Sequence, residues 1–395
     1  MSGRIAIVGA SLAGVRAVKA LRRKGFGGEI VLIGEEGELP YDRPPLSKQF
    51  LTSDEPITPR LLEAASFYDT VDLRLGVRAT ALSLRDQAVT LNDGSSVAAD
   101  HIIIATGASA RSLPGLPDRI KGVTTFRTAA DARRVREAFD EGPRVVVIGA
   151  GFIGCEIAAS ARARGLQVTV IELRHSPVIR DVGALVGGTI AALHRENGVD
   201  MRFGTTVSSF VADKRIRALH LSDGSRIEAD LVVVGVGANP RTDWLDGSGL
   251  LLRNGLACDE RCRVIGGGGH VWAAGDVASR PSSRFAESLR VEHWTNASEQ
   301  ASALASNLLD PNLFRPYDSI PYFWSDQYQH RYQIIGRISS SDDTTLLHGT
   351  LRERPFAVAY HRDGRLRGVV ACDMPDVIAQ ARVQLDDETI QLSPT

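Results

Sequence analysis

A glycine-rich turn that occurs twice constrains this chain of 395 residues more than any other feature. Residues Gly9–Gly14 (GASLAG) recur as Gly149–Gly154 (GAGFIG). Each copy directly follows an apolar run, Ile5–Val8 in the first and Val145–Ile148 in the second. An apolar run that ends in such a turn predicts a buried strand leading into a helix. We therefore expect two similar modules in one chain.

Both modules continue in the same order after the turn. Helices are predicted from Gly14 to about Lys24 and from Gly154 to about Arg164, each followed by a second strand and a meander. The sequence Asp-Gly-Ser then leads, at residues 93–107 and 223–237, into an apolar run that ends in glycine. This order predicts an α/β fold with two Rossmann-like, dinucleotide-binding modules, each with a parallel sheet.

The rest of the chain contains no third turn of this kind. A helix is predicted over Thr295–Leu309, and the segment from about Arg241 can complete the first module. From Phe314 the chain is rich in strand patterns, such as Tyr332–Gly336 and Pro355–Tyr360, which predict a small C-terminal α+β domain. The last dozen residues are polar and are expected to fray.

The second turn has the full pattern of a dinucleotide site. Gly149, Gly151 and Gly154 suit a tight turn, close approach of a pyrophosphate and close packing of helix on strand. Glu172 stands 18 residues beyond Gly154, at the end of a predicted strand, where its carboxylate can bind an adenosine ribose and repel a 2′-phosphate. We expect NADH to be preferred over NADPH, although Arg174, two residues further on, has the positive charge that can accommodate a 2′-phosphate.

The first turn has Ser11 in place of the middle glycine, and its acidic partner is Glu35, 21 residues after Gly14. A serine is small, and its hydroxyl can donate to a phosphate oxygen. Gly275 and Asp276 follow a further apolar run, where a carboxylate can accept from a ribitol hydroxyl. Two dinucleotide sites with chemistry between them indicate FAD together with a nicotinamide cofactor.

Charge and composition exclude several other classes. The 46 basic and 47 acidic residues leave a net charge of −1, so neither nucleic acid nor a membrane is expected as the main partner. No apolar run approaches the roughly 18 residues that span a bilayer. The four cysteines form no CxxC pair and no metal-ligand spacing, so no metal site and a cytoplasmic location are expected.

Seven segments together resemble one family, and the resemblance covers nearly the whole chain. They are PYDRPPLSK at residues 40–48, ATG at 105–107, RT at 127–128, GFIGCE at 151–156, AGD at 274–276, VEHWTNA at 291–297 and PYFWSDQY at 321–328. In these segments the chain resembles the FAD-dependent NADH:ferredoxin reductases of cytochrome P450 and Rieske dioxygenase systems. That family is putidaredoxin reductase-like and distantly similar to apoptosis-inducing factor.

The resemblance implies two glutathione-reductase-like dinucleotide-binding domains and a C-terminal α+β domain. The FAD-binding domain would be discontinuous, over residues 1–113 and 241–315. The NAD-binding domain would occupy 114–240, and the C-terminal domain 316–395. A monomer or weak dimer is expected.

The resemblance also assigns cofactor contacts residue by residue. For FAD it implies Gly9, Ser11, Leu12, Ala13, Gly14, Glu35, Arg43, Lys48, Ala79, Ala105, Thr106, Gly107, Arg127, Gly275, Asp276, Glu292, His293, Trp294 and Trp324. For NAD it implies Gly149, Gly151, Phe152, Ile153, Gly154, Glu156, Glu172 and Gly237. Trp324 has the alternative of filling the core.

The same resemblance implies a catalytic pair, Lys48 and Glu156, beside the flavin N5 and the nicotinamide. A cation there stabilises negative charge on the reduced flavin, and a carboxylate keeps the buried cation paired. The alternative for Lys48 is a solvated loop lysine. Lysine is rare in this chain, which has five, so its presence in a motif is informative.

The expected function is electron transfer from NADH through FAD to a small iron–sulfur ferredoxin. A hydride carries two electrons, whereas an iron–sulfur cluster accepts one at a time, which is why a flavin stands between them. An acidic ferredoxin would dock on arginines, for which Arg284, Arg290, Arg315 and Arg331 are candidates, with an ordinary solvated surface as the alternative for each.

Three other functions have requirements of their own. A disulfide reductase would need a redox-active cysteine pair near the flavin, and residues 35–51 contain no cysteine. An NADH oxidase, or a reductase of a quinone or another small molecule, stays open. A redox-regulated binding protein like apoptosis-inducing factor would need a strongly basic surface. Two stretches depart from the family pattern, residues 172–177 and 372–375, and leave cofactor preference and partner less defined.

Overall fold

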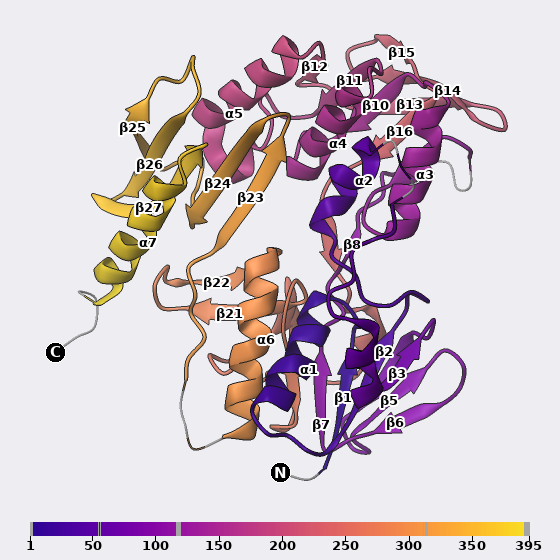
Figure 1. Ribbon diagram of the computed structural model, residues 1–395, viewed down its shortest axis with the longest axis vertical. Coiled ribbons are helices and arrows are strands. Elements are labelled where there is room, and N and C mark those ends of the chain that lie inside the picture. Colours follow the sequence, from indigo (N-terminus) through magenta and orange to yellow (C-terminus); the bar gives the residue numbers. More distant parts are fainter. Residues whose placement is uncertain are drawn as a thin grey trace. The chain divides into compact units, whose positions relative to one another are not determined.

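A computed structural model describes residues 3–53, 55, 57–115, 120–310, 312 and 315–390 (Figure 1). The chain forms two compact units, each assembled from three segments. The first unit comprises Met1–Asp42, Arg60–Ser109 and Asn239–Pro321, and the second Arg43–Pro59, Ala110–Ala238 and Tyr322–Thr395. Among the described residues, no helix combines the length and apolar character that a bilayer span requires.

A five-stranded parallel sheet is the centre of the first unit. Its order is β20-β7-β1-β2-β3, with all neighbouring strands parallel. The strands are β1 (Arg4–Val8), β2 (Glu29–Gly34), β3 (Asp72–Leu75), β7 (His101–Ile104) and β20 (Val271–Ala273). Continuous runs of buried β-branched residues, as in β1 and β7, are typical of strands covered on both faces.

Two helices pack together on one face of this sheet, α1 (Leu12–Arg23) and α6 (Trp294–Leu309), and share one apolar cluster with it. Figure 1 shows them side by side. The other face is covered by smaller sheets. These are β4 (Ala79–Ser83), β5 (Ala88–Leu91) and β6 (Ser96–Ala98); and β18 (Leu252–Arg253), β19 (Gly255–Ala257), β21 (Ala278–Ser282) and β22 (Glu287–Arg290), with the short helix η3 (Asp243–Leu245). The short helix η2 (Ala65–Thr70) instead contributes Tyr68 to the apolar cluster of α1 and α6.

The second unit repeats the arrangement. Its parallel sheet has the order β12-β11-β10-β16-β9, and an antiparallel meander β13-β14-β15 precedes β16, which pairs with β10 and β9. The strands are β9 (Val123–Thr125), β10 (Val145–Ile148), β11 (Val168–Glu172), β12 (Asp200–Phe203), β13 (Val207–Ala212), β14 (Ile216–Leu221), β15 (Arg226–Glu228) and β16 (Leu231–Val234). The helices are η1 (Pro44–Ser47), α2 (Gln49–Thr52), α3 (Ala129–Asp140), α4 (Phe152–Ala163) and α5 (Ile179–Glu196), the last kinked at Gly183.

A C-terminal antiparallel sheet belongs to the same second unit. Its order is β23-β24-β27-β26-β25, and one helix follows it. The elements are β23 (Tyr322–Gln327), β24 (His330–Gly336), β25 (Asp343–Gly349), β26 (Phe356–Arg362), β27 (Arg365–Cys372) and α7 (Pro375–Ile390). Two short strands, β8 (Ala108–Ala110) and β17 (Ala238–Pro240), pair where the chain passes from one unit to the other.

The predicted fold class, an α/β chain with two Rossmann-like sheets and a C-terminal α+β part, is confirmed. Helices α1 and α4 each begin two residues earlier than predicted. The last glycine of each turn, Gly14 or Gly154, therefore lies inside its helix. The predicted fraying of the last dozen residues is wrong for 384–390, where α7 continues and buries Leu385. The final five residues lie outside the described part.

Candidate functional site

In the second unit, the turn between β10 and α4 uses its three glycines in different ways. A Cβ on Gly149 would lie 2.4 Å from the Gly235 carbonyl oxygen, and one on Gly154 would lie 2.1 Å from the Gly149 oxygen. Both positions therefore exclude a side chain. Gly151 has open space where a Cβ would stand. The turn is thus packed at both ends and open in the middle, as the approach of a pyrophosphate requires.

The start of α4 suits an anion. Its first turn contains no acidic residue, so the partial positive charge of the helix N-terminus is not neutralised. Glu172, the last residue of β11, accepts from the backbone N–H of Ala150 at 2.8 Å and of Arg174 at 2.9 Å. These bonds fix the carboxylate beside the turn. Gly237, three residues after β16, also has open space around it. These residues fit the nucleotide of NAD(H).

The buried pair predicted from the sequence, Lys48 and Glu156, is present in the second unit. Lys48 Nζ lies 2.9 Å from Glu156 Oε2, and the two side chains are 13% and 6% exposed. Ser47 Oγ donates to the same oxygen at 2.5 Å, and Ser325 Oγ donates to Oε1 at 2.8 Å. Lys48 also donates to the Pro44 carbonyl at 3.1 Å. Lys48 is therefore not a solvated loop lysine.

Glu156 reaches this position because of its place in α4. It lies one turn after Gly151, on the helix face that is buried. Lys48 follows the short helix η1, in which two prolines at the first helical positions favour the helical backbone. Ser160, one helical turn after Glu156, donates to the Ser47 carbonyl at 2.7 Å and ties α4 to this segment.

Five further predicted residues of the second unit lie at its surface or between its elements. Arg43 donates to the Arg127 carbonyl at 2.7 Å. The ring of Phe152 meets that of Phe323 edge-on at 4.9 Å. Trp324 is partly exposed and stacks on Tyr322 at 6.2 Å, so it is not a buried core residue. The side chain of Ile153 is exposed.

In the first unit, the turn between β1 and α1 is built like its counterpart. A Cβ on Gly9 would lie 2.1 Å from the Ala105 oxygen, and one on Gly14 would lie 2.0 Å from the Gly9 oxygen. Ser11 is the residue before α1, which begins with Leu12 and Ala13, and the first turn of α1 has no acidic residue. The turn fits a second dinucleotide phosphate, which the resemblance assigns to FAD.

Predicted FAD residues meet at the carboxyl ends of the strands of this unit. Glu35, directly after β2, forms an ion pair with Arg241. Thr106 donates to the Arg241 carbonyl at 2.9 Å, and Gly107 adopts a positive φ of 67° with open space around it. In open α/β sheets ligands bind at this edge. Ala79 is buried at the start of β4.

Gly275 and Asp276 follow β20 and lie beside α1. A Cβ on Gly275 would meet the Ala13 Cβ at 3.0 Å, and Gly275 N donates to Gln300 Oε1 at 2.9 Å. Arg290 donates to the Asp276 carbonyl at 3.0 Å and forms an ion pair with Glu292. The loop is thereby fixed on the two helices that flank it.

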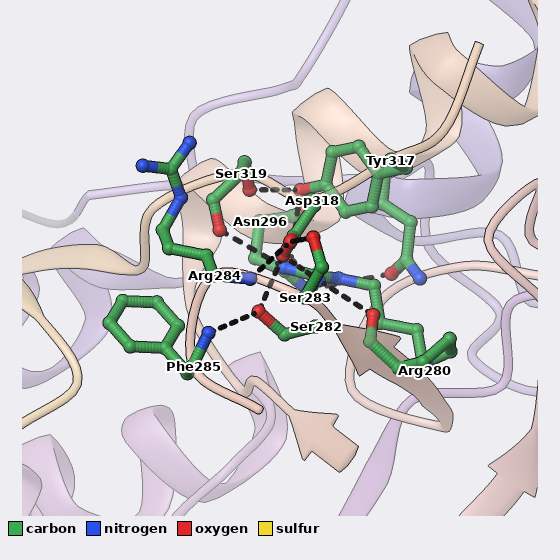
Figure 2. Close-up of polar contacts among 11 residues, drawn as sticks. Arg280, Ser282, Ser283, Arg284, Phe285, Asn296, Tyr317, Asp318 and Ser319 are labelled. Atoms are coloured by element: carbon green, nitrogen blue, oxygen red, sulfur yellow. Dashed lines mark hydrogen bonds and ion pairs between the residues drawn. The ribbon is translucent and has the colours of Figure 1, made fainter. Parts of the chain in front are cut away.

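The start of α6 is held by two sets of polar contacts. His293 precedes the helix, and Trp294 Nε1 donates to Asp42 Oδ1 at 2.9 Å. Tyr317 Oη lies 3.1 Å from Asn296 Oδ1, and Ser319 donates to Tyr317 at 2.8 Å (Figure 2).

Asp318 is the centre of the network in Figure 2. Its carboxylate accepts from Ser282 at 2.6 Å, Ser283 at 3.0 Å, Arg284 N at 3.0 Å and Arg280 at 2.9 Å. Burial alone raises the pKa of Asp318, but the hydrogen bonds from these groups outweigh it and lower the pKa. The network joins the segment after α6 to the β21–β22 hairpin.

Comparison with known proteins decides the family. Residues 3–301 match the model of the pyridine nucleotide-disulphide oxidoreductases, and residues 322–394 match that of the reductase C-terminal domain. The chain is 36% identical to rhodocoxin reductase of Rhodococcus erythropolis, over 94% of this chain and 86% of the relative. It is 35% identical to the ferredoxin–NAD(+) reductase subunit of a benzene 1,2-dioxygenase system of Pseudomonas putida, over 99% and 94%. The chain belongs to the FAD-dependent ferredoxin reductases.

A solved structure supports the same assignment. The reductase matches the chain of a covalent putidaredoxin reductase–putidaredoxin complex with a TM-score of 0.91 at 31% identity, covering 98% of this chain and 93% of that chain. The predicted family, fold class, oxidoreductase activity and cofactors FAD and NAD(H) are confirmed. The individual cofactor contacts stay predictions.

The four cysteines of the reductase take no part in a disulfide. Cys155, Cys258, Cys262 and Cys372 are free and buried, and burial raises the pKa of each thiol. Buried thiols with raised pKa values are poor nucleophiles. A disulfide reductase, the first alternative, gains no support.

Sequence reasoning missed the partners that hold the predicted residues. Ser47, Ser325 and Asp42 lie inside recognised segments, yet a motif does not say which of its residues contact each other. Arg241, the partner of Glu35, stands outside every segment.

His330, Cys372 and Asp373 come close enough to bind a metal, but Asp373 already accepts from His330 at 2.6 Å and from Arg331 N at 2.7 Å.

Proposed function

We propose that this reductase carries electrons from NADH through FAD to a small, acidic ferredoxin that serves a cytochrome P450 or a Rieske oxygenase. Bound FAD would accept a hydride from NADH and pass single electrons to an iron–sulfur cluster. The main support is the buried Lys48–Glu156 pair, because Glu156 lies on the helix whose N-terminus forms the proposed NAD turn. Burial of such a cation is costly unless it is paired and hydrogen-bonded, as Lys48 is with Glu156 and the Pro44 carbonyl.

The residues proposed for FAD in the first unit surround one edge of its parallel sheet. The α1 N-terminus would bind phosphate, Glu35 a ribose, and Asp276 the ribitol. The pair of Glu35 with Arg241 supports a polar site there. In the second unit Arg43, Lys48, Arg127 and Trp324 are proposed to contact FAD, on the resemblance of their segments alone.

A preference for NADH over NADPH rests on Glu172. One oxygen accepts from the backbone N–H of Ala150 in the turn and the other from that of Arg174, so the carboxylate is rigidly placed. A 2′-phosphate near it would be repelled. Arg174 is exposed, and its backbone rather than its side chain contacts Glu172.

An acidic partner would find fewer available arginines than the sequence suggests. Arg290 forms an ion pair with Glu292, and Arg331 with Asp326. Their positive charge is already compensated by these pairs, so we propose Arg315 as the first docking position. Arg315 is exposed.

The decisive experiment measures steady-state NADH oxidation by the purified yellow protein with a panel of two-iron and three-iron ferredoxins, and with oxygen or a quinone alone. We expect turnover to rise strongly with at least one ferredoxin. Equal turnover with oxygen or a quinone alone would instead identify an NADH oxidase or a small-molecule reductase. A colourless preparation that cannot be reconstituted with FAD would contradict the proposal entirely.

Three finer statements stay proposals of the same kind. The division into an FAD-binding domain (1–113 and 241–315), an NAD-binding domain (114–240) and a C-terminal domain (316–395) can be checked by limited proteolysis. A monomer or weak dimer can be checked by light scattering. A cytoplasmic location is in keeping with four free thiols.

A further inference from the structure

A chain of buried hydrogen bonds leads from a histidine to Glu156. His194, on α5, is 0% exposed and belongs to no recognised segment. Its Nε2 lies 3.1 Å from Gln327 Oε1, and Gln327 Nε2 donates to Ser325 Oγ at 3.2 Å. Ser325 then donates to Glu156 Oε1 at 2.8 Å. All of these residues belong to the second unit.

Tyr328 extends the chain at the far end. Its Oη lies 3.0 Å from His194 Nδ1, and the two rings meet edge-on at 5.3 Å. Ser325, Gln327 and Tyr328 come from β23 and the residue after it, whereas His194 comes from α5. The chain therefore ties the C-terminal sheet to α5 and both of them to α4.

The direction of every bond follows from the carboxylate. An ionised Glu156 only accepts, so the single hydroxyl proton of Ser325 points to it. Ser325 must then accept from the amide N–H₂ of Gln327, which turns the amide oxygen toward His194. His194 Nε2 must therefore donate.

The second ring nitrogen of His194, Nδ1, accepts the last hydrogen bond of the chain. Burial lowers the pKa of His194 to about 4, so the imidazole is neutral near pH 7. With the proton on Nε2, Nδ1 is an acceptor and receives the hydroxyl of Tyr328. Four consecutive bonds thus donate toward one negative charge, an arrangement in which each bond polarises and strengthens the next.

This chain of hydrogen bonds does not suit proton transfer. An amide neither gains nor loses a proton readily, and Gln327 stands in the middle of the chain. Its role is therefore to orient and polarise. Glu156 binds Lys48 and Ser47 through Oε2, while Oε1 accepts from Ser325. The chain fixes the rotation of the carboxylate and with it the place of the ammonium.

We propose that Ser325, Gln327, His194 and Tyr328 are positioning residues that orient the Glu156 carboxylate and so hold Lys48 in place for reduction of FAD by NADH. This inference rests on the function proposed above for Lys48 and Glu156. It adds four residues whose contribution acts through Glu156.

The first readout does not depend on turnover. The holoenzyme is labelled with ¹³C at the lysine Cε atoms, and the five lysines give few enough signals to assign Lys48 by comparison with Lys48→Arg. Ser325→Ala removes the donor to Oε1. We expect the Lys48 signal to shift or broaden, with a smaller change in Tyr328→Phe, which removes only the last hydroxyl.

The matched control is Tyr360→Phe. The Tyr360 hydroxyl is buried and donates to the Val182 carbonyl at 2.5 Å, so it also ties the C-terminal sheet to α5. It has no link to Glu156. If the chain acts by direct hydrogen bonding, Tyr360→Phe leaves the Lys48 signal in place even if it lowers stability.

The second readout is stopped-flow reduction of FAD at saturating NADH. Small displacements of a positioned group cost of order 10- to 100-fold in rate, so Ser325→Ala is expected to be slower by about that factor, with Tyr360→Phe unchanged. The proposal is overturned if the Lys48 signal of Ser325→Ala stays at its wild-type position, or if Tyr360→Phe moves it equally. If NADH fails to reduce wild-type FAD, the proposed function falls, while the Lys48 comparison still decides the hydrogen-bond chain.

Discussion

Glu156 holds Lys48 at 2.9 Å in a setting where both side chains are almost removed from water. A second lysine–glutamate pair, Lys121 with Glu141 at 3.1 Å, is exposed by 66% and 51%. The same two residue types thus form both a buried pair and a surface pair in a single molecule. Their comparison tests whether the buried pair has a role that the surface pair lacks.

Glu156→Gln keeps the shape of the side chain and removes its charge. Lys48 is then buried without a counter-charge, which is expected to lower the free energy of unfolding by about 3 to 5 kcal/mol. FAD reduction by NADH is expected to slow as well. Urea denaturation and stopped-flow spectroscopy measure the two effects. Glu141→Gln is the matched control and is expected to change neither, and similar losses in both variants would contradict a special role for the buried pair.

Glu172→Gln tests cofactor choice. The amide keeps one acceptor but loses the charge that repels a 2′-phosphate, so KM for NADH is expected to rise by about tenfold while KM for NADPH stays constant or falls. Steady-state assays with both cofactors at several concentrations give the ratio. Glu196→Gln, at the far end of α5 and paired with Arg354, is the control. An equal rise for both cofactors would remove the assigned role.

Sequence alone predicts the two Rossmann-like modules because their signals are local. An apolar run, a glycine turn and a helix lie within about 20 residues, and the buried β1 and β10 follow directly from their β-branched runs. The glycines at 149 and 154 are needed because backbone atoms approach them from the same turn or the next strand. These steric requirements therefore appear in the amino-acid sequence as glycines at fixed positions after an apolar run.

The partners of the site residues are non-local and leave no such pattern. Ser325 and Glu156 are 169 residues apart in sequence, and Glu35 and Arg241 are 206 apart. Their contacts depend on how sheets and helices pack. His194 in particular is one histidine on a helix, and only the fold places Gln327 and Tyr328 at its two nitrogens.

His194 should make stability depend on pH in the acid range. Burial lowers its pKa from 6.5 in the unfolded chain to about 4 in the folded one. Between these values the unfolded state binds more protons, so stability falls as pH falls from about 6.5 toward 4 and is fully present above that window. The loss can reach about 3 kcal/mol. Urea denaturation of wild type and His194→Gln at several pH values should show their difference shrinking with falling pH. A constant difference would show that His194 does not titrate as inferred.

Asp318→Asn tests the network that holds the β21–β22 hairpin to the segment after α6. Arg280 is only 2% exposed and pairs with Asp318 at 2.9 Å, so removal of the negative charge leaves a guanidinium buried without a counter-ion. The free energy of unfolding is expected to fall by about 3 kcal/mol, and FAD to dissociate more readily because the same hairpin supplies Arg290 to the Asp276 carbonyl. Denaturation and release of flavin fluorescence measure the two effects. Asp213→Asn breaks a surface pair with Arg217 at 3.2 Å and is expected to change neither. If Asp318→Asn retains FAD and unfolds like the control, Arg280 is not held by this carboxylate.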